Sequence, residues 1–254
     1  MSVPNRGDWL QLEGVTAVFD GFTALDIAHF GVDWGELRVV IGPNGAGKTT
    51  LCDVISGKTR PSSGRVTIDD REVTGWRETE IAALGVGRKF QTPSVFDSLT
   101  VYENMELALP GRRAWWRNLI GRESAEQRER IHALLERTHL IGRRDDPARD
   151  LSHGQRQWLE ISMLMVSGAR LLLVDEPAAG LTDSETALTA DLLLELKGQH
   201  TLLVIEHDMA FVRRLGGTVT CLHQGRILAE GPIDRVSAHE QVIEAYLGRG
   251  KAGR

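Results

Sequence analysis

Four short apolar runs recur along the chain, each bounded by Gly, Asp or Pro. They are LRVVIG at residues 37–42, LLLVDEP at 171–177, TLLVIEHD at 201–208 and TVTCLHQG at 218–225. None alternates cleanly between apolar and polar positions, which is typical of strands covered on both faces of a parallel sheet. We therefore expect these runs to form one mostly parallel sheet.

Helical patterns lie between the expected strands. One is KTTLCDVISG at 48–57, and another is SETALTADLLLELKG at 184–198. Thr182 and Glu185 at the start of the second have the spacing of a capping box. Strands that alternate with helices in this way are typical of an α/β fold.

The middle of the chain has a different pattern. Between about residue 92 and residue 167 we find no convincing strand but several helical stretches. In ESAEQRERIHALLERTHL, one helical face carries Ile131, Leu134, Leu135 and Thr138. The pattern predicts a helical part inserted into the α/β core, and it predicts one further helix near the end, at 238–247.

Composition narrows the class of protein. Hydrophobic residues make up 41% of the 254 residues and the net charge is −5, which argues against a general nucleic-acid or anionic-membrane surface. The only cysteines, Cys52 and Cys221, form neither a disulfide framework nor a metal-binding spacing, and they fit a reducing cytosol. Because no apolar stretch reaches about 18 residues and the N-terminus has no apolar signal region, we expect neither a membrane span nor a secretory signal.

The segment GPNGAGKT, residues 42–49, matches the phosphate-loop pattern G-x-x-x-x-G-K-[ST] in full. It follows an expected strand and precedes an expected helix, as the chemistry requires. Glycines let backbone N–H groups surround phosphate oxygens, and the helix presents its positive end to the same charge. Lys48 can then reach the β- and γ-phosphates, and the hydroxyl of Thr49 can bind Mg²⁺.

Two carboxylates end the run LLLVDE. Ligands of α/β sheets bind at the carboxyl ends of the strands, so Asp175 and Glu176 are expected beside the phosphate loop. Asp175 would hold Mg²⁺, directly or through water, and Glu176 would act as the general base on an attacking water. An acidic pair at a strand end is a weak signal alone and a strong one with the phosphate loop.

Four more short sequences complete an ordered set of motifs. FDGF contains Phe19 and Phe22, GRKFQTP contains Gln91, LSHGQ covers 151–155, and VIEHD contains His207. In this order the motifs resemble those of ATP-binding cassette (ABC) ATPases, in which LSHGQ corresponds to the signature usually written LSGGQ. The resemblance covers nearly the whole chain.

The resemblance implies the fold of a P-loop NTPase ABC cassette. That fold has a RecA-like core, an N-terminal antiparallel β subdomain and an inserted helical subdomain. Residues 1–91 and 166–230 would form the core with the β subdomain, 92–165 the helical subdomain with the signature, and 231–254 a C-terminal tail.

The resemblance also implies a site for ATP and Mg²⁺. Catalytic roles are expected for Glu176, His207 and Gln91, and metal ligation for Thr49, Gln91 and Asp175. Nucleotide-binding roles are expected for Phe19 (or Phe22 in its place), Gly42, Pro43, Asn44, Gly45, Ala46, Gly47, Lys48, Thr49, Thr50, Ser152, Gly154 and Gln155. Two subunits are expected to dimerise head to tail, with each ATP between one phosphate loop and the partner's signature.

The signature also reads as the start of a helix, with Ser152 and Gln155 at the spacing of a capping box. Gly154 weakens this first turn, and the resemblance explains it by close backbone approach to a phosphate of the partner's ATP. Two positions depart from the family pattern. Thr182 stands where the dimer-contact loop often has Asp, which leaves the contacts of that loop open, and His153 stands where the signature usually has Gly.

His153 has two interpretations. It is either a tolerated surface substitution or a ring that faces bound ATP at a helix N-terminus. The second predicts a modest pH dependence of ATP-driven dimerisation between about pH 6 and 7.5, around the reference pKa of histidine.

A single cassette without a fused membrane domain resembles a bacterial importer subunit. TPSVFDSLTVYENMELAL and VIEAYLG are similar to importers of the branched-chain amino acid and amide class, and LSHGQRQWLEISML with DEPAAGLTDSET is most similar to the urea-importer subunit. The implied partners are two transmembrane permease subunits, a second ATPase subunit and, indirectly, a periplasmic or extracellular substrate-binding protein. The implied location is the cytoplasmic face of the inner membrane.

Other functions remain as alternatives. The chain could serve a branched-chain amino acid importer or a lipid or lipopolysaccharide extraction complex. A soluble ABC ATPase linked to nucleic acid is disfavoured by the acidic charge, so no nucleic-acid partner is expected. The segment GRRAWWRNLIGR at 111–122, with Trp115 and Trp116, is either an exposed loop and helix edge or an element suited to a membrane interface or a partner groove.

Overall fold

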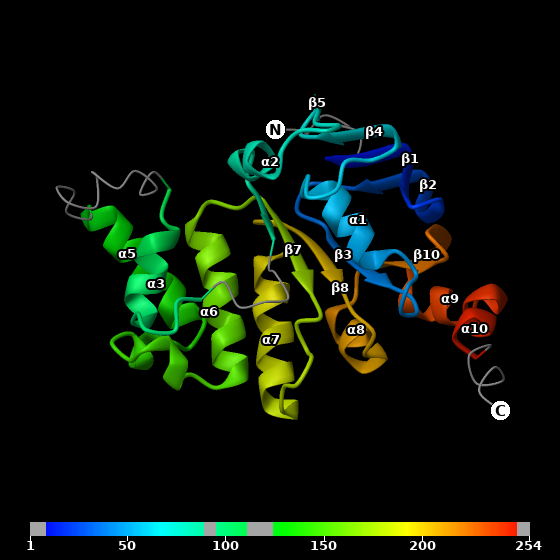
Figure 1. Ribbon diagram of the computed structural model, residues 1–254. Coiled ribbons are helices and arrows are strands. Elements are labelled where there is room, and N and C mark those ends of the chain that lie inside the picture. The colour runs from blue at the N-terminus through cyan, green and yellow to red at the C-terminus, as the bar shows by residue number, and fades with distance from the viewer. Residues whose placement is uncertain (1–8, 89–94, 111–123, 248–254) are drawn as a thin grey trace, which may run out of the picture.

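Two β-sheets form the framework of the computed structural model, which describes residues 9–88, 95–110 and 124–247 (Figure 1). A six-stranded sheet has the order β10-β9-β3-β8-β7-β6, and a four-stranded sheet has the order β2-β1-β4-β5. The strands are β1 (Leu10–Phe19), β2 (Phe22–Val32), β3 (Leu37–Ile41), β4 (Ser63–Ile68), β5 (Arg71–Glu72), β6 (Val86–Arg88), β7 (Leu171–Asp175), β8 (Thr201–Ile205), β9 (Thr218–His223) and β10 (Arg226–Pro232).

The larger sheet confirms the mostly parallel arrangement expected from the four apolar runs. Strands β9, β3, β8, β7 and β6 are parallel, and only β10 pairs in the antiparallel sense. Side chains of one strand enter two different cores: Val39 joins one apolar cluster, whereas the next residue, Val40, joins the other. Burial on both faces removes the need for a polar position at every second residue, which explains the continuous apolar runs.

Helices cover both faces of this sheet. Helix α1 (Lys48–Ile55) lies between the two sheets, because its apolar residues and those of both sheets share one cluster (Figure 1). The opposite face is covered by α7 (Asp183–Leu196) and α8 (Met209–Leu215). The short helix α2 (Glu78–Ala83) precedes β6. Burial raises the pKa of the Cys52 thiol on α1 to about 12, so this thiol is an unreactive core residue.

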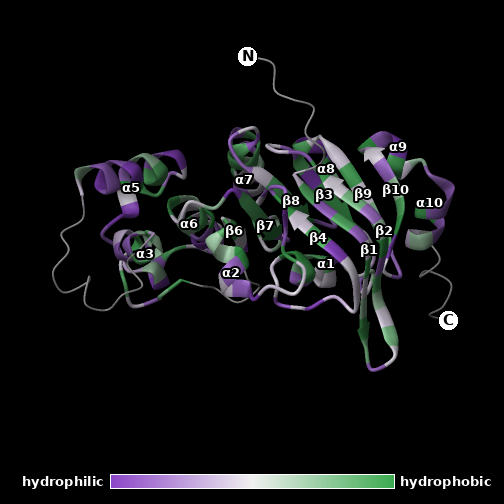
Figure 2. Cartoon of the chain, turned by 90° about the horizontal axis from the view of Figure 1, so that it is seen from above, coloured by the Kyte–Doolittle hydropathy of each residue, from purple (hydrophilic) through white to green (hydrophobic). Residues whose placement is uncertain are grey.

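The helical part lies at one end of the molecule, opposite the β1–β2 hairpin (Figure 2). It contains α3 (Val101–Ala108), α5 (Ala125–Arg137), the 3-10 turns Ile141–Arg143 and Ala148–Asp150, and α6 (His153–Val166). Ile131 and Leu135 of α5 are fully buried, as the expected apolar face requires. The described residues include neither Gln91, with the domain boundary predicted beside it, nor Trp115 and Trp116.

The end of the chain confirms the expected helix and adds a shorter one. Helix α10 (Glu240–Leu247) lies within the expected range 238–247, and α9 (Ile233–Ser237), which was not predicted, precedes it. Helix α9 follows Pro232 directly and spans fewer than two turns. A segment this short has no measurable helical period, so the apolar pattern could not reveal it. None of the described helices is long and apolar enough to cross a membrane.

Candidate active site

The phosphate loop joins β3 to α1 and needs glycine for steric reasons. Gly42, Gly45 and Gly47 have φ of 152°, 78° and 104°, in the region that favours glycine. A Cβ on Gly42 would lie 2.2 Å from the carbonyl oxygen of Leu222, and one on Gly47 would lie 2.7 Å from that of Ala24. The loop is therefore pressed against β9 on one side and β2 on the other.

Lys48 and the start of α1 give this loop its positive charge. Lys48 Nζ donates to the carbonyl oxygens of Gly42 (2.7 Å) and Pro43 (3.1 Å), which holds the ammonium inside the loop. No side chain caps the N-terminus of α1, so its first N–H groups and helix dipole face the position a phosphate would take. Thr49, in the first turn, is exposed, and Thr50 is half-buried. These features fit a polyphosphate ligand.

The acidic pair lies at the same edge of the sheet. Asp175 ends β7, and Glu176 follows with φ of 47°, a left-handed conformation that is strained for a residue with a side chain. His207 follows β8, and its Nδ1 lies 3.5 Å from Glu176 Oε1. Because β8 lies between β3 and β7, the sheet brings together the three motifs that were expected to meet.

A buried carboxylate that the sequence interpretation missed supports this arrangement. Glu206, 1% exposed, accepts the backbone N–H of Ala178 (2.9 Å) on Oε1. Its Oε2 accepts the N–H groups of His207 (2.9 Å) and Asp208 (3.3 Å). One side chain thus joins the segment after Glu176 to the segment that carries His207. The sequence feature that could have revealed Glu206 is its position directly after a fully apolar strand, where a charged side chain is not expected to be exposed to solvent.

A cavity of about 440 Å³ lies at this edge. Its walls are the phosphate-loop residues 42–44, Glu176 and His207, together with Ala245 and Tyr246 from α10. The last two residues were not expected here. The sequence interpretation placed this end of the chain in a tail without a role.

The signature sequence begins α6 as a capping box, which confirms the expected local structure. Ser152 Oγ accepts the N–H of Gln155 (3.2 Å), and Gln155 Oε1 accepts the N–H of Ser152 (3.0 Å). Ser152 Oγ also donates to Glu185 Oε1 of α7 (3.0 Å). A Cβ on Gly154 would lie 2.6 Å from that same oxygen. Glu185 therefore disfavours a side chain at position 154 within the same chain. This explanation for glycine adds to the expected approach to a partner's phosphate.

The two departures from the family pattern meet at the loop between Glu176 and α7, which His153 contacts and Thr182 ends. His153 Nε2 lies 3.1 Å from the carbonyl oxygen of Ala179 and 3.1 Å from Gln157 Nε2. His153 is exposed, and both of these contacts are with its own chain. Thr182 is the N-cap of α7, where its hydroxyl accepts the N–H of Glu185 (3.3 Å) and Glu185 Oε2 accepts its N–H (3.0 Å).

Phe19 and Phe22 pair directly across the β1–β2 turn. The turn residues Asp20 and Gly21 both have positive φ, as a two-residue hairpin requires. Directly paired residues project from the same face, and the two side chains are 47% and 67% exposed. Either ring is accessible to a planar base, so both alternatives stay open.

The oxygen donors of Thr49 and Asp175 suit Mg²⁺, which prefers hard oxygen ligands. Thr49 is in the first turn of α1 and Asp175 is at the end of β7, on the edge that holds the cavity. The third expected ligand, Gln91, lies outside the described residues.

Comparison with known proteins agrees with this geometry. The ABC transporter family profile matches residues 25–179, and a profile described as branched-chain amino acid ATP-binding cassette transporter matches residues 226–252. The high-affinity branched-chain amino acid transport ATP-binding protein LivG of Salmonella typhimurium is 34% identical over 248 residues, which cover 94% of this chain and 97% of LivG. BraF of Pseudomonas aeruginosa, with the same description, is 34% identical over 249 residues, with the same coverage.

Solved structures give the same result. The crystal structure of the ADP conformation of MJ1267, an ATP-binding cassette of an ABC transporter, has a TM-score of 0.83 and 31% identity over 95% of this chain and 99% of that chain. A dimeric post-hydrolysis structure of the ATP-binding cassette MJ0796, bound to ADP and Pi, has a TM-score of 0.73 and 25% identity over 88% of this chain and 98% of that chain. The chain therefore belongs to the ABC transporter family, as an ATPase whose ATP hydrolysis is coupled to transport.

Proposed function

We propose that this chain is the ATP-hydrolysing subunit of a bacterial importer of the branched-chain amino acid class, located at the cytoplasmic face of the inner membrane. The observation that carries the proposal is the meeting of the phosphate loop, Glu176 and His207 around one cavity. The descriptions of LivG and BraF support the importer class.

In the proposed reaction, the phosphate loop, Lys48 and Thr50 hold the phosphates of ATP. Glu176 removes a proton from a water whose oxygen attacks the γ-phosphorus, and the bond from that phosphorus to the ADP oxygen breaks. His207, 3.5 Å from Glu176, contacts the γ-phosphate. Mg²⁺ held by Thr49 and Asp175, with Gln91, would offset negative charge on the phosphates.

The second ATPase subunit completes each site in this proposal. Ser152, Gly154 and Gln155 present the N-terminus of α6 to the ATP held by the partner. The dimer of MJ0796 supports such an arrangement. Within one subunit, the contacts of Ser152 with Glu185 and of His153 with Ala179 join this surface to the segment after Glu176.

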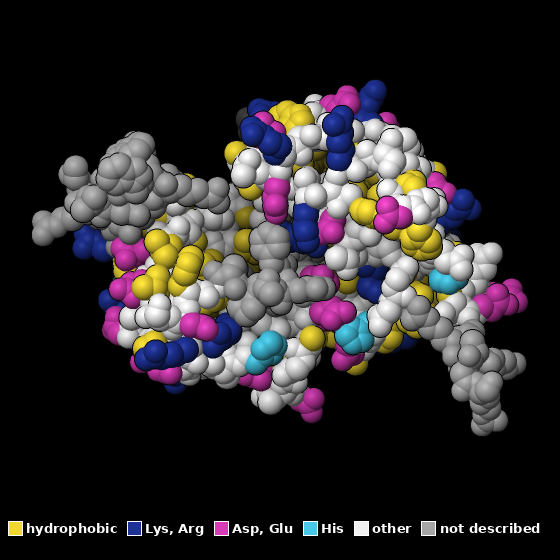
Figure 3. All heavy atoms as spheres, in the orientation of Figure 1, with side chains coloured by type: hydrophobic (Ala, Val, Ile, Leu, Met, Phe, Trp, Pro, Cys, Tyr) yellow, Lys and Arg dark blue, Asp and Glu magenta, His cyan; other side chains and the backbone are white. Residues whose placement is uncertain are grey.

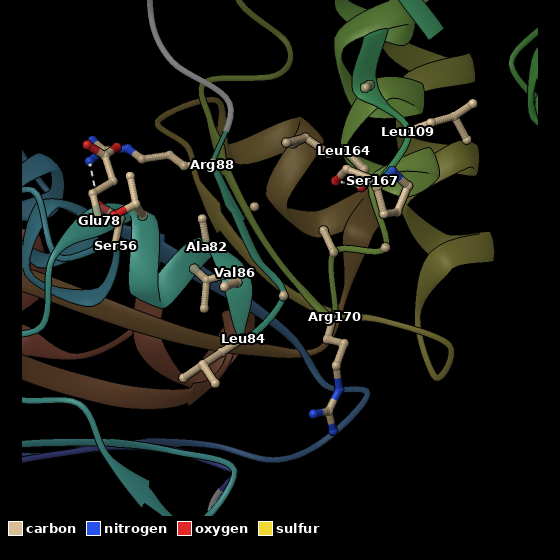
Figure 4. Close-up of a pocket in the computed structure, with 18 residues that line it drawn as sticks. Ser56, Glu78, Ala82, Leu84, Val86, Arg88, Leu109, Leu164, Ser167 and Arg170 are labelled. Carbon is tan, nitrogen blue, oxygen red and sulfur yellow. Dashed lines mark hydrogen bonds between the residues drawn. The ribbon is translucent and has the colours of Figure 1, made fainter. Parts of the chain in front are cut away.

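A permease subunit would dock in a second cavity, of about 540 Å³, between the core and the helical part (Figure 4). Residues of α2 and β6 line one side, and Leu109, Leu164 and Ser167 line the other. Arg88 on this wall forms a partly buried ion pair with Asp53 of α1, so movement of an occupant can reach the helix that begins at the phosphate loop. An extracellular binding protein would deliver the substrate to the permeases.

The transported molecule is a finer question. The relatives support branched-chain amino acids, whereas the segments around His153 and Thr182 resemble the urea-importer subunit. The ATPase does not contact the transported molecule, so the test belongs to the binding protein encoded beside it. Calorimetric titration of that protein with leucine and with urea, in parallel, distinguishes the two: binding of leucine alone favours the first, and binding of urea alone favours the second.

The ATPase proposal is tested by Glu176→Gln, which keeps the size of the side chain and removes the base. Turnover is expected to fall by at least about a thousandfold while ATP binding is retained, and ATP should then produce a stable dimer. Glu195→Gln on α7, an exposed residue paired with Arg137 in the helical part, is the matched control. Undiminished turnover in Glu176→Gln would remove Glu176 from the proposed role.

Nucleic acid is not a proposed partner. Figure 3 shows that positive and negative side chains are interspersed on the face that it draws. A DNA- and RNA-binding assay at low and high salt tests this, because contacts with phosphates weaken steeply as salt rises. Salt-sensitive binding in the micromolar range would contradict the proposal.

A further inference from the structure

We propose that Asn104 is a positioning residue that joins α3 to the signature helix α6, so that the two helices move as one unit between the permease cavity and the partner's ATP. The proposal rests on the proposed function and adds to it a route from the permease to the signature. The joint between the two helices is the segment 95–100, which precedes α3 and contacts the start of α6.

Helices α3 and α6 pack against each other with their ends in register (Figure 1). At their C-terminal ends, Leu109 after α3 and Leu164 and Ser167 of α6 line the cavity of about 540 Å³ proposed for the permease (Figure 4). At their N-terminal ends, Arg156 Nη1 on α6 donates to Oδ1 of Asp97, just before α3 (2.5 Å). Helix α6 has 14 residues and is therefore about 20 Å long. A permease and the partner's nucleotide would thus contact opposite ends of the same two helices.

Asn104 on α3 fixes the segment 95–100 to that helix. Its side chain is fully buried, and its Oδ1 accepts the N–H of Phe96 (2.8 Å). Its Nδ2 donates to the carbonyl oxygens of Phe96 (3.1 Å), Leu99 (3.4 Å) and Thr100 (2.9 Å). Because a buried polar group without a partner is costly, these four bonds specify one position of the segment.

The same segment is bonded to the residues that precede the signature. The N–H of Ala148 donates to the carbonyl oxygen of Leu99 (2.8 Å), and the N–H of Arg149 donates to that of Asp97 (3.2 Å). Arg156 Nη2 also donates to the carbonyl oxygen of Arg149 (3.3 Å). The side chain of Asp97 is 62% exposed, so its ion pair contributes little alone. The buried amide and the backbone bonds therefore make the joint rigid, and Arg156 connects it to α6.

The joint is separate from the contacts that hold α6 on the core. Trp158 Nε1 of α6 donates to Thr189 Oγ1 of α7 (2.9 Å), and Ser152 Oγ donates to Glu185 Oε1 of the same helix (3.0 Å). These contacts keep the signature in place when the joint is lost, whereas α3 no longer follows α6. Loss of Asn104 is therefore expected to uncouple the two helices and to leave the nucleotide site intact.

Amide hydrogen exchange with and without ATP tests the joint in the chain alone. In the Glu176→Gln background, ATP is expected to slow exchange at 150–156, where the signature meets the partner's nucleotide. Through the joint, it is also expected to change exchange at 95–109 by at least about threefold. Asn104→Leu keeps the size of the side chain and loses its bonds, so the response at 150–156 should remain and that at 95–109 should disappear.

Two further variants serve as control and confirmation. Thr138→Val removes a buried hydroxyl that bonds to Ser162 of α6, away from the joint, and should keep both responses. Asp97→Arg, at an exposed position where folding is not at risk, places like charges together and should weaken the response at 95–109. The charge exchange Asp97→Arg with Arg156→Asp should restore it. Thermal unfolding verifies that each variant folds.

The complete importer gives the functional measurement. The chain is purified with the permeases encoded beside it and placed in lipid vesicles, and the ATPase rate is measured with binding protein that carries leucine or urea. Stimulation of the wild type is expected to be at least about fivefold. In Asn104→Leu it should fall below about twofold while the unstimulated rate stays within about twofold of wild type, and Thr138→Val should keep the stimulation.

The outcomes separate this inference from the function it rests on. A response at 95–109 that persists in Asn104→Leu or is missing from the wild type overturns the role of Asn104, and so does undiminished stimulation, while the nucleotide site stands. An unstimulated rate that falls as far as the stimulated one marks a purely structural role and also overturns it. Wild-type protein without an ATP response at 150–156 overturns the dimer and the joint together. A wild-type complex that neither leucine nor urea stimulates overturns the importer class, and the exchange measurement then decides the joint.

Discussion

Replacing Gly154 by alanine separates two reasons for a glycine in the first turn of α6. One reason is the contact with Glu185, since a Cβ would lie 2.6 Å from Glu185 Oε1. The other is the expected approach of this turn to a phosphate held by a partner subunit. The first acts on the stability of the single chain, and the second acts only on the ATP-bound dimer.

The magnitudes predict the sign of the stability change. In Gly154→Ala the Glu185 carboxylate must move, so it loses the bond from Ser152 Oγ, which contributes about 0.5–1.5 kcal/mol. It also disturbs the cap of α7 at Thr182, where a cap contributes about 0.5–2 kcal/mol. Alanine is better than glycine in a helix by about 0.5–1 kcal/mol. The net expectation is a destabilisation of about 1 kcal/mol, which becomes a stabilisation of about 0.5–1 kcal/mol once Glu185→Ala removes the carboxylate.

The assay is urea unfolding of four proteins: wild type, each single variant and the double variant. ATP-driven dimerisation of the same set, made in the Glu176→Gln background, is measured by size-exclusion chromatography. Both Gly154→Ala proteins are expected to remain monomeric with ATP. The same sign of stability change in both backgrounds would refute the Glu185 contact, and dimerisation of Gly154→Ala at the wild-type ATP concentration would refute the approach to phosphate.

The same cycle has a pH dependence of defined sign. The backbone N–H of Thr182, then its hydroxyl, then the Ser152 hydroxyl hold the pKa of Glu185 below its usual value of 4.5. A lowered carboxyl pKa contributes stability above the unfolded pKa, and this contribution is lost as pH falls through the folded pKa. The coupling between positions 154 and 185 is therefore expected to be full at pH 7 and to shrink as the pH falls below about 4.5.

Two further predictions concern single positions. Glu206→Gln replaces one oxygen that accepts backbone N–H groups by an amide that donates, so the segments that carry Glu176 and His207 lose part of their support. The value of kcat should then fall on the order of tenfold to a hundredfold with little change in KM, and an unchanged kcat would remove Glu206 as a positioning residue. Arg170→Leu loses cation–π contacts with the rings of Trp9 (5.2 Å) and Trp34 (5.1 Å), and urea unfolding should show a loss of about 1–2 kcal/mol, whereas an unchanged midpoint would contradict this.

Features with a short-range cause could be predicted from the sequence. The phosphate loop places Lys48 and Thr49 through the spacing of its glycines between a strand and a helix. Ser152 and Gln155 cap α6 because a hydroxyl and an amide three residues apart can reach each other's N–H groups. The apolar runs also predicted the parallel sheet, because a strand that is buried on both faces is apolar at successive positions.

Features that depend on two distant segments could not be predicted. Glu206 looks like any acid at a strand end until the order of β7 and β8 places Ala178 within 2.9 Å of its carboxylate. The contact of Gly154 with Glu185 needs α6 and α7 to begin side by side. Resemblance to a family supplied a role for Gly154 but did not reveal this contact.

By itself, the sequence determined the chemistry of this protein: a phosphate loop, an acidic pair after a buried strand and a capped signature helix, each defined over a few residues. Only the tertiary structure decided which segments surround that chemistry, above all that Ala245 and Tyr246 of α10 line the cavity beside residues 42–44. The physical reason is the separation along the chain over which each interaction acts. Hydrogen bonding and helical or strand periodicity act between neighbours in the chain, whereas the walls of a cavity depend on the order of strands in the sheet and on which face each helix buries.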